Sequence, residues 1–416
     1  MKIDVIRSEF MKAWQMAERC SSTRSTIGSL SGVLLTAEDG KVLLSATDLK
    51  TSICCVASGV QVSQDGSAIL PVKLLGELFK KVSADRFSIE IKDEKGLFIA
   101  GRNKTRFSTW PVSDFPKLSG SADAQELCEI PVSDLLRALV EGSTASSPTD
   151  DFPKYLGACL LQLKEKTFQV ISTDGRRLSL SKCSCKSECE SELLLPVLPL
   201  RELQRFLGIV ASSDPEALVR ILYDGSTAWF QMGQIEFSVR RVESSFPNYE
   251  KILNPNSTTT MLVKRNELLS ALGRIDIVVR SHTRLAVLYL SPGGRLGITG
   301  KAPEFGTAIE ELDVSIEGEE MKAAFNVGFL EDGLKSMSTE DIRMRLNGEV
   351  GQMTLRREGD DDFLYMLMPA RITEQDLIDS SEDDYGDFSD SPQEESDEAL
   401  DTLKSLKAEA KEDAEG

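Results

Sequence analysis

The residues able to do chemistry are few. His282 is the single histidine among 416 residues, which removes most general-base and triad schemes, although carboxylate or lysine chemistry stays open. The segment Gly294–Lys301 is the nearest approach to a phosphate loop. Five residues separate its outer glycines instead of four, and Ala302 stands where Ser or Thr should follow the lysine. We interpret this segment as a hairpin turn followed by a strand, and the sequence offers no positive sign of an enzyme.

Asp174, in the run Thr173-Asp174-Gly175, looks catalytic in isolation. The first part of the chain has the similar run Thr47-Asp48-Leu49 at the matching place. Aspartate after a strand commonly accepts hydrogen bonds from the backbone of a turn. The pair therefore favours a repeated turn at a strand end over a catalytic carboxylate.

The eight cysteines are typical of small apolar residues in a reducing compartment. Only Cys183, Cys185 and Cys189 cluster, and their C-x-C-x3-C spacing could hold a metal ion. A fourth ligand is not evident, and His282 is remote in sequence. A solvated polar loop is favoured over a metal site, and we expect no cofactor.

The elements that must position these residues occur three times along the chain. The first recurring segment has a helix-capping residue, Ser8, Ser133 or Asn266, after a short strand, and the copies are offset by 125 and 133 residues. The second is an apolar strand end running into a helix. Its copies are Leu70–Leu75, Leu195–Leu200 and Phe325–Leu330. A period of about 125 residues indicates a domain that buries its own core, not a solenoid repeat.

Each copy reads as strand, helix, two or three strands, a second helix and further strands, which predicts an α+β fold with two helices laid on antiparallel sheet. In the first copy a hairpin turn at Glu38-Asp39-Gly40 is expected, and the second helix spans about 72–82. The predicted domains are 1–122, 126–255 and 258–372, followed by a tail, 373–416. The strands expected are 86–91, 96–101 and 105–109, then 159–163, 167–173, 217–223, 228–232 and 236–242, then 285–290, 295–299, 341–346, 352–356 and 363–368.

The acidity of the chain lies mostly in the tail. Residues 373–416 hold 17 Asp and Glu against three Lys, which accounts for −14 of the net charge of −19 and leaves −5 for the repeats. Whole-chain charge therefore does not exclude a nucleic-acid partner for the body. The N-terminus has no apolar run typical of a signal peptide, and no stretch approaches the roughly 18 apolar residues of a membrane span. We expect a cytoplasmic protein.

Six segments, in order along the three repeats, resemble those of the bacterial sliding clamps, the DNA polymerase III beta subunits. They are Ala46–Leu49, Phe107–Thr109 with Asp114–Pro116, Ser172–Leu178, Ser245–Tyr249, Phe325–Val327 and Tyr365–Ile372. The resemblance covers essentially all of residues 1–372. It implies a processivity factor for a DNA polymerase, and not an enzyme.

The resemblance implies that two chains join head to tail in a homodimer, whose six domains close a ring around double-stranded DNA. Such a ring needs only diffuse attraction to phosphates and no base readout. The helix carrying Glu331, Asp332 and Lys335 does not fit that requirement. The candidate DNA-binding residues are Arg24, Lys73, Lys80, Lys81, Arg201 and Arg205. The dimer contact carried over from the family joins Ile277 and Val278 to Phe107.

The resemblance also implies a pocket for a short linear motif, roughly Gln-x-x-Leu-Phe, presented by the DNA polymerase III alpha subunit, the clamp loader and other clamp-motif proteins. Methionine, leucine and isoleucine side chains would make an adaptable apolar slot. The pocket residues carried over by position are Tyr155, Leu156, Thr173, Gly175, Arg176, Arg177, Leu178, Pro247, Ile252, Met366, Met368, Pro369, Ala370, Arg371 and Ile372.

The chain departs from the family in three places. Arg176 stands where a histidine is common, Ala370 stands where a second methionine is common, and the chain continues beyond Ile372. A rival interpretation is a three-domain interaction scaffold that keeps the fold and the pocket without encircling DNA. The acidic helix around Glu331 slightly favours that rival.

The composition of the tail predicts disorder, except for a short helix near 400–410, because few apolar residues are available to offset the entropy of ordering. Gln375-Asp376-Leu377-Ile378 is a partial match to the docking motif. One hypothesis is that the tail competes weakly for the pocket, attracted by Arg176 and Arg177, and shields the clamp from non-specific nucleic-acid contact. The alternative is an inert, solubilising tail.

Overall fold

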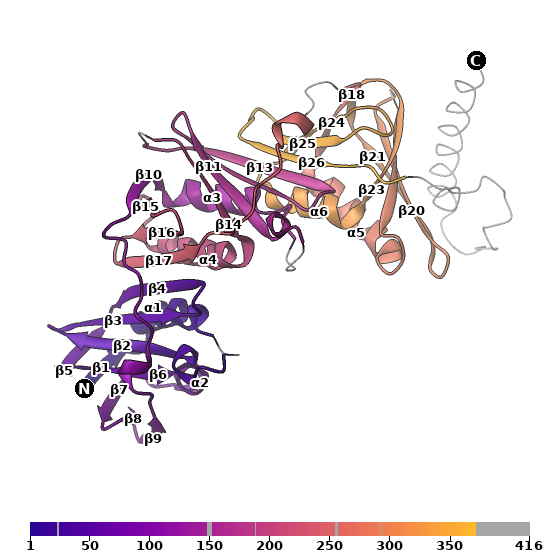
Figure 1. Ribbon diagram of the computed structural model, residues 1–416. Helices are drawn as coiled ribbons and strands as arrows, with labels where there is room; N and C mark the ends of the chain where they lie inside the picture. Colours follow the sequence, from indigo (N-terminus) through magenta and orange to yellow (C-terminus); the bar gives the residue numbers. More distant parts are fainter. Residues whose placement is uncertain (23–24, 148–151, 188, 254–256, 292, 372–416) are drawn as a thin grey trace, which may run out of the picture. The chain divides into compact units, whose positions relative to one another are not determined.

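The computed structural model describes residues 1–22, 25–147, 152–187, 189–253, 257–291 and 293–371 (Figure 1). Arg24, Ile372 and the tail lie outside these residues. The predictions of a disordered tail, of a helix near 400–410 and of a docking motif at 375–378 therefore fall outside the described part of the chain.

The described chain forms two compact units. Unit 1 comprises Met1–Leu139, Leu160–Gln169 and Cys183–Ser244, and unit 2 comprises Val140–Cys159, Val170–Lys182 and the chain from Ser245 onward. The central segment of the sequence thus contributes to both units. The division into domains 1–122, 126–255 and 258–372 stays a prediction that depends on the internal repeat.

The repeat is visible in six places where a strand runs directly into an α-helix, two in each copy, as predicted. The six pairs are β1 (Lys2–Ile6) with α1 (Arg7–Cys20), β6 (Gly66–Pro71) with α2 (Val72–Lys81), β10 (Gln125–Pro131) with α3 (Val132–Gly142), β14 (Ser191–Pro196) with α4 (Val197–Ser213), β18 (Thr259–Lys264) with α5 (Arg265–Val279), and β23 (Met321–Asn326) with α6 (Val327–Ser336).

The predicted helix caps are wrong by two residues, since the N-cap positions of α1 and α5 are Ile6 and Lys264. Ser8, Ser133 and Asn266 lie one position inside their helices, and the residues before α1 and α5 make no side-chain cap bond. The helices start earlier because a neighbouring segment satisfies the first backbone N–H group. The Arg7 amide donates to the Asp85 carbonyl at 2.9 Å. In the same way, the Val132 amide donates to the Ala217 carbonyl and the Arg265 amide donates to the Glu340 carbonyl, each at 2.8 Å.

Unit 1 contains a five-stranded antiparallel sheet, β5-β1-β7-β8-β9, and an eight-stranded sheet, β10-β15-β16-β17-β4-β3-β2-β6. Helix α1 packs against β3 and β4 and contacts α2 and α4. The remaining strands of unit 1 are β2 (Gly32–Glu38), β3 (Lys41–Thr47), β4 (Thr51–Ala57), β5 (Val60–Gln64), β7 (Arg86–Lys92), β8 (Lys95–Ala100), β9 (Asn103–Ser108), β15 (Leu218–Tyr223), β16 (Thr227–Met232) and β17 (Ile235–Arg240).

Unit 2 contains the strand order β13-β26-β25-β24-β18-β22 and a four-stranded sheet, β21-β20-β19-β23. Helix α5 packs on β20 and β21 and against α6. The strands β11 (Ala158–Lys164), β12 (Thr167–Thr173) and β13 (Arg177–Ser184) have residues in both units. The others are β19 (Leu285–Ser291), β20 (Arg295–Ala302), β21 (Gly306–Asp313), β22 (Ser315–Gly318), β24 (Asp341–Leu346), β25 (Met353–Arg357) and β26 (Phe363–Leu367).

Each unit has its own apolar core between helices and sheet, which confirms the predicted α+β class. In unit 1, Phe10 and Trp14 of α1 meet Phe79 of α2 and Phe87 and Phe98 of the five-stranded sheet. In unit 2 the core joins α5, α6 and strands of both its sheets. Among the described residues, no helix is both long and apolar enough to span a membrane. The same part of the chain has four short 3-10 helices, Gly28–Ser31, Val112–Asp114, Lys154–Gly157 and Glu250–Ile252.

The two turns singled out in the sequence form as predicted. Asp39 and Gly40 have positive φ, 50° and 76°, and join β2 to β3 in the two-residue turn that suits a hairpin. The segment Gly294–Lys301, which was compared with a phosphate loop, begins with a turn in which Gly294 has φ 83°. The turn is followed by β20, which pairs with β19.

The cysteine prediction needs correction. All eight cysteines are free thiols, but Cys183 is buried in β13, and Cys185 and Cys189 are half-buried, so the three do not lie in a solvated loop. The reason is that β13 extends to Ser184 and carries Cys183 into the sheet. Among the described residues, no group of three or more His, Cys, Asp or Glu side chains is placed to hold a metal ion.

Candidate functional site

Unit 2 holds a cavity of about 710 Å³ into which the structure gathers most of the predicted pocket residues. Its apolar lining is partly open to solvent, since Ile252 is 48% exposed and Met368 is 49% exposed. Ten predicted residues line the cavity: Tyr155, Thr173, Gly175, Arg176, Arg177, Leu178, Pro247, Ile252, Met366 and Met368.

Four predicted residues do not line this cavity, and Ile372 lies outside the described residues. Leu156 belongs to the 3-10 helix before β11, and its carbonyl accepts a hydrogen bond from the Ser147 amide. The Ala370 amide donates to the Ala324 carbonyl at 2.8 Å, so Ala370 forms an antiparallel bridge with β23. The four residues are Leu156, Pro369, Ala370 and Arg371.

The cavity has four further lining residues that sequence reasoning missed, namely Tyr249, Lys251, Leu253 and Gln352. Three of them adjoin residues already singled out: Tyr249 ends the Ser245–Tyr249 segment, and Lys251 and Leu253 flank Ile252. Gln352 lies just before β25 and carries no comparable signal in the sequence.

One wall of the cavity is the turn between β12 and β13, which is built from hydrogen bonds of its own polar residues. The Thr173 hydroxyl donates to the Arg177 carbonyl at 2.7 Å and accepts from the Gly175 amide at 3.1 Å. Asp174 Oδ1 accepts from the Arg176 and Arg177 amides at 3.0 and 3.1 Å. The prediction of a structural turn is confirmed, because the Asp174 carboxylate is occupied by the backbone and holds the turn in shape.

The adjoining wall comes from β13 and β26, which pair antiparallel and place Leu178 opposite Met366. Beyond the last paired residues, the Met368 amide donates to the Arg176 carbonyl at 2.9 Å. The register thus brings Leu178, Met366 and Met368, from distant parts of the sequence, to one apolar surface.

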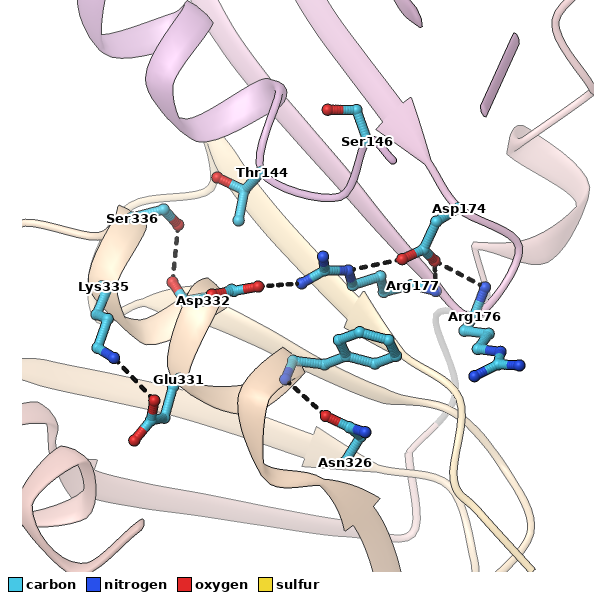
Figure 2. Close-up of polar contacts among 12 residues, drawn as sticks. Thr144, Ser146, Asp174, Arg176, Arg177, Asn326, Glu331, Asp332, Lys335 and Ser336 are labelled. Carbon is cyan, nitrogen blue, oxygen red and sulfur yellow. Dashed lines mark hydrogen bonds and ion pairs between the residues drawn. The ribbon is translucent and has the colours of Figure 1, made fainter. Parts of the chain in front are cut away.

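Arg177 is the most constrained side chain of the cavity, and only 8% of its side chain is exposed. Figure 2 shows its guanidinium between the turn and α6. It donates to Asp174 Oδ2 at 2.9 Å and to Asp332 Oδ2 at 2.7 Å. It also donates to the Tyr365 hydroxyl at 3.0 Å and lies over the Phe329 ring, 4.2 Å from the centroid.

The charge of Arg177 is therefore compensated inside unit 2. Burial acts to lower the pKa of Arg177, but Tyr365, Asp332 and Asp174 more than offset it, so that pKa is raised. Burial raises the pKa of Tyr365, whose hydroxyl donates to the Phe329 carbonyl at 2.9 Å. This arrangement fixes the cavity wall, and nothing in it resembles an activated nucleophile or general base.

Arg176 differs from its neighbour. It is exposed, it lines the cavity, and Figure 2 shows its side chain pointing away from the Arg177 network. The second exposed cation of the lining is Lys251. The expectation that both Arg176 and Arg177 attract the acidic tail is therefore wrong for Arg177, because its charge is already paired.

The candidate DNA-binding residues of α2 are all exposed. Lys73 and Lys81 form no ion pair within the described part of the chain, whereas Lys80 Nζ lies 3.1 Å from Glu18 Oε1 of α1. A paired lysine is less available to phosphates than a free one. Arg24 lies outside the described residues.

The candidate DNA-binding residues of α4, Arg201 and Arg205, are less available to phosphates than Lys73 and Lys81. Glu202 pairs with Arg205 at 2.5 Å and with Arg19 of α1 at 3.2 Å, and Arg201 is half-buried. Two further cations that the sequence analysis did not name, Arg19 and the exposed Lys12, lie on α1. The signal that could have found them is the polar face of that amphipathic helix. In α6, Lys335 is paired with Glu331 at 2.8 Å.

The residues predicted for the dimer contact differ in exposure. Ile277 on α5 is 61% exposed, while Val278 is half-buried and packs against the core of unit 2. Phe107 on β9 is only 7% exposed because its ring covers Gly96 of β8, where an added Cβ would come within 2.2 Å of the ring. Of the three, Ile277 offers the most free apolar surface within its unit.

Comparison with known proteins decides the family. Residues 1–119 match the family described as DNA polymerase III beta subunit, N-terminal domain, and residues 250–371 match DNA polymerase III beta subunit, C-terminal domain. The chain belongs to the DNA polymerase III beta subunit family. It is therefore a beta sliding clamp, the processivity factor of a DNA polymerase.

Relatives of this clamp align with most of the chain. The beta sliding clamp of Pseudomonas putida is 29% identical over 375 residues, which is 89% of this chain and 100% of that protein. The crystal structure of the DNA polymerase III beta subunit of Pseudomonas aeruginosa is similar with a TM-score of 0.81 and 26% identity. That of Thermotoga maritima has a TM-score of 0.82 and 23% identity, and each covers 89% of this chain and 100% of its own.

Proposed function

We propose that two copies of this clamp join head to tail in a homodimeric ring of six domains that encircles double-stranded DNA and tethers partner proteins through the unit 2 cavity. The observation that carries this proposal is the match of both ends of the chain to one clamp family, together with the cavity formed by the residues that the family resemblance singled out. DNA is held by topology and not by sequence.

Ring closure is supported by two sheet edges. Strand β9, which carries Phe107, ends the five-stranded sheet of unit 1, and β21, which packs on α5, ends the four-stranded sheet of unit 2. An unpaired sheet edge readily accepts a strand from another chain. We infer that β9 of one chain lies near β21 of the other and that Ile277 contributes the apolar centre of the contact.

The cavity is proposed to take the Gln-x-x-Leu-Phe motif of the DNA polymerase III alpha subunit, the clamp loader and other clamp-motif proteins. Leu178, Met366 and Met368 supply an apolar surface for the leucine and phenylalanine, and burying each yields about 1.5–3 kcal/mol. Partners held by so few side chains exchange readily. The clamp itself then catalyses no reaction, and it acts in the cytoplasm, where replication occurs.

A topological assay tests the ring. The clamp, loaded on a primed circular plasmid by a clamp loader and ATP, is expected to stay on the circle through gel filtration in high salt. It is expected to leave when a restriction enzyme linearises the plasmid. A scaffold that keeps the cavity without encircling DNA would bind circular and linear plasmid equally, and that result would reject the proposal.

Charge reversal at Lys73 and Lys81 is expected to weaken clamp loading equally on DNA of every sequence, because phosphates carry no sequence information. The slope of log K against log salt for transient DNA binding should fall by about 0.9 for each phosphate contact removed. Fluorescence anisotropy with duplexes of different sequence measures both quantities.

The matched control reverses Lys41 and Lys164, which are exposed on strand hairpins and not on the helices. The control should leave the slope unchanged. A loss that depends on the DNA sequence, or an equal loss in the control, would contradict the assignment of α2 to the DNA-facing surface.

A further inference from the structure

Unit 1 contains a second cavity, of about 330 Å³, that is the repeat counterpart of the docking cavity in unit 2. It is lined by the turn between β3 and β4, by the segment Pro116–Ser119 and by residues at the adjoining ends of β16 and β17. The docking cavity is lined by the equivalent turn of the second repeat, by the segment around Pro247 and by β26.

The backbone frame of the two cavities is the same. In unit 1 the Thr47 hydroxyl donates to the Thr51 carbonyl at 2.6 Å, and Asp48 Oδ1 accepts from the Thr51 amide at 2.7 Å. These bonds repeat those of Thr173 and Asp174 in the turn of unit 2.

The flanking strands repeat the same pattern. The Arg240 amide donates to the Lys50 carbonyl at 3.0 Å, just as the Met368 amide donates to the Arg176 carbonyl at 2.9 Å. This relation identifies Arg240 as the counterpart of Met368 and Lys50 as the counterpart of Arg176.

The side chains on this common frame are opposite in character. Ser52 faces Ser238 across β4 and β17, and their hydroxyls lie 2.6 Å apart, where the docking cavity has Leu178 facing Met366. Arg240 replaces the apolar Met368. A leucine or phenylalanine side chain would bury little apolar surface here, so the unit 1 cavity does not suit the docking motif.

The unit 1 cavity is instead basic. Lys50, Lys117 and Arg240 line it, all three are exposed, and none forms an ion pair within the described residues. The one carboxylate of the lining, that of Asp224, accepts hydrogen bonds from the Ser226 and Thr227 amides at 2.8 Å each, which occupies it in a turn. Three free cations among serine and threonine hydroxyls are complementary to a carboxylate-rich segment.

We propose that the unit 1 cavity binds the acidic C-terminal segment of this protein, residues 373–416, from the same chain or a neighbouring one. That segment carries 17 Asp and Glu against three Lys. For a random coil of 44 residues, the length of that segment, the root-mean-square end-to-end distance is about 35 Å. The docking cavity is the poorer electrostatic partner, since it presents two exposed cations, Arg176 and Lys251, instead of three, and Arg177 is neutralised there.

This inference goes beyond the proposed function and is tested on the full-length protein by cross-linking. A carbodiimide joins a lysine ammonium group to a carboxylate in contact with it, without a spacer. At low salt, Lys50 and Lys117 are expected to cross-link to aspartates and glutamates of residues 373–416, as located by mass spectrometry. Lys41 and Lys164, which are also exposed and lie outside the cavity, serve as reference lysines within the same sample.

Arg240→Glu places a negative charge in the cavity without removing a reactive lysine. It should lower the yield of cross-links at Lys50 and Lys117 by roughly fivefold, as expected for the loss of about 1 kcal/mol of charge attraction. Arg102→Glu makes the same change at an exposed turn and should leave the yield unchanged. Yields at Lys50 and Lys117 no higher than at the reference lysines, or dominant cross-links to Lys251 of the docking cavity, would overturn the proposal.

Discussion

Replacing Arg177 by Met is expected to destabilise unit 2 by about 1–3 kcal/mol, because groups behind the cavity wall lose their hydrogen-bond donor. The same loss should let the cavity wall shift and weaken binding of a docking peptide by more than tenfold. Asp174 would lose its side-chain donor, and the Tyr365 hydroxyl would lose the guanidinium that fixes it behind the cavity wall. Urea denaturation measures the first effect, and anisotropy of a labelled Gln-x-x-Leu-Phe peptide measures the second.

Arg176→Met is the matched control, since Arg176 is the neighbouring arginine, lines the same cavity and is exposed. Its effect on the free energy of unfolding should stay within about 0.5 kcal/mol. Arg177→Lys keeps the charge without the planar fork and should recover only part of the loss. If Arg177→Met unfolds at the same urea concentration as Arg176→Met, the network does not support the cavity as described.

Ile277→Asp is expected to raise the dissociation constant of the homodimer by roughly 30-fold or more, because a central apolar interface residue contributes about 2 kcal/mol or more. Ile277 is suited to this test because its side chain is 61% exposed, so the substitution adds no buried charge within the unit. Light scattering over a dilution series measures the mass. Substituting Val278 would be harder to interpret, since that residue also packs against the core.

The control is Leu218→Asp, which changes an exposed leucine on β15, in the central repeat and away from the proposed interface. This variant should remain a dimer wherever the unmodified protein does. A dimer that persists in Ile277→Asp at submicromolar concentration would show that α5 does not form the contact.

The internal repeat, the strand-to-helix junctions and the hairpin at Asp39-Gly40 could be predicted from the sequence because they depend on residues close together in the chain. An apolar strand end followed by helical spacing specifies a junction locally, and the six junctions appear where expected. The turn at Asp174 was also predictable, since both of its hydrogen-bonding partners lie within three residues.

What the tertiary structure decided depends on groups far apart in the chain. Arg177 is paired because Asp332 and Tyr365, 155 and 188 residues away, meet it behind the cavity, and no local pattern distinguishes it from the exposed Arg176. The helices begin before Ser8 and Asn266 because distant carbonyls accept from their first amides. The sequence by itself determined which elements form, in what order, and which residues could make a cavity. The packing of these elements determined which charged side chains form ion pairs within the fold and which stay exposed to bind partners. The reason is that an ion pair depends on distance in space and not along the chain.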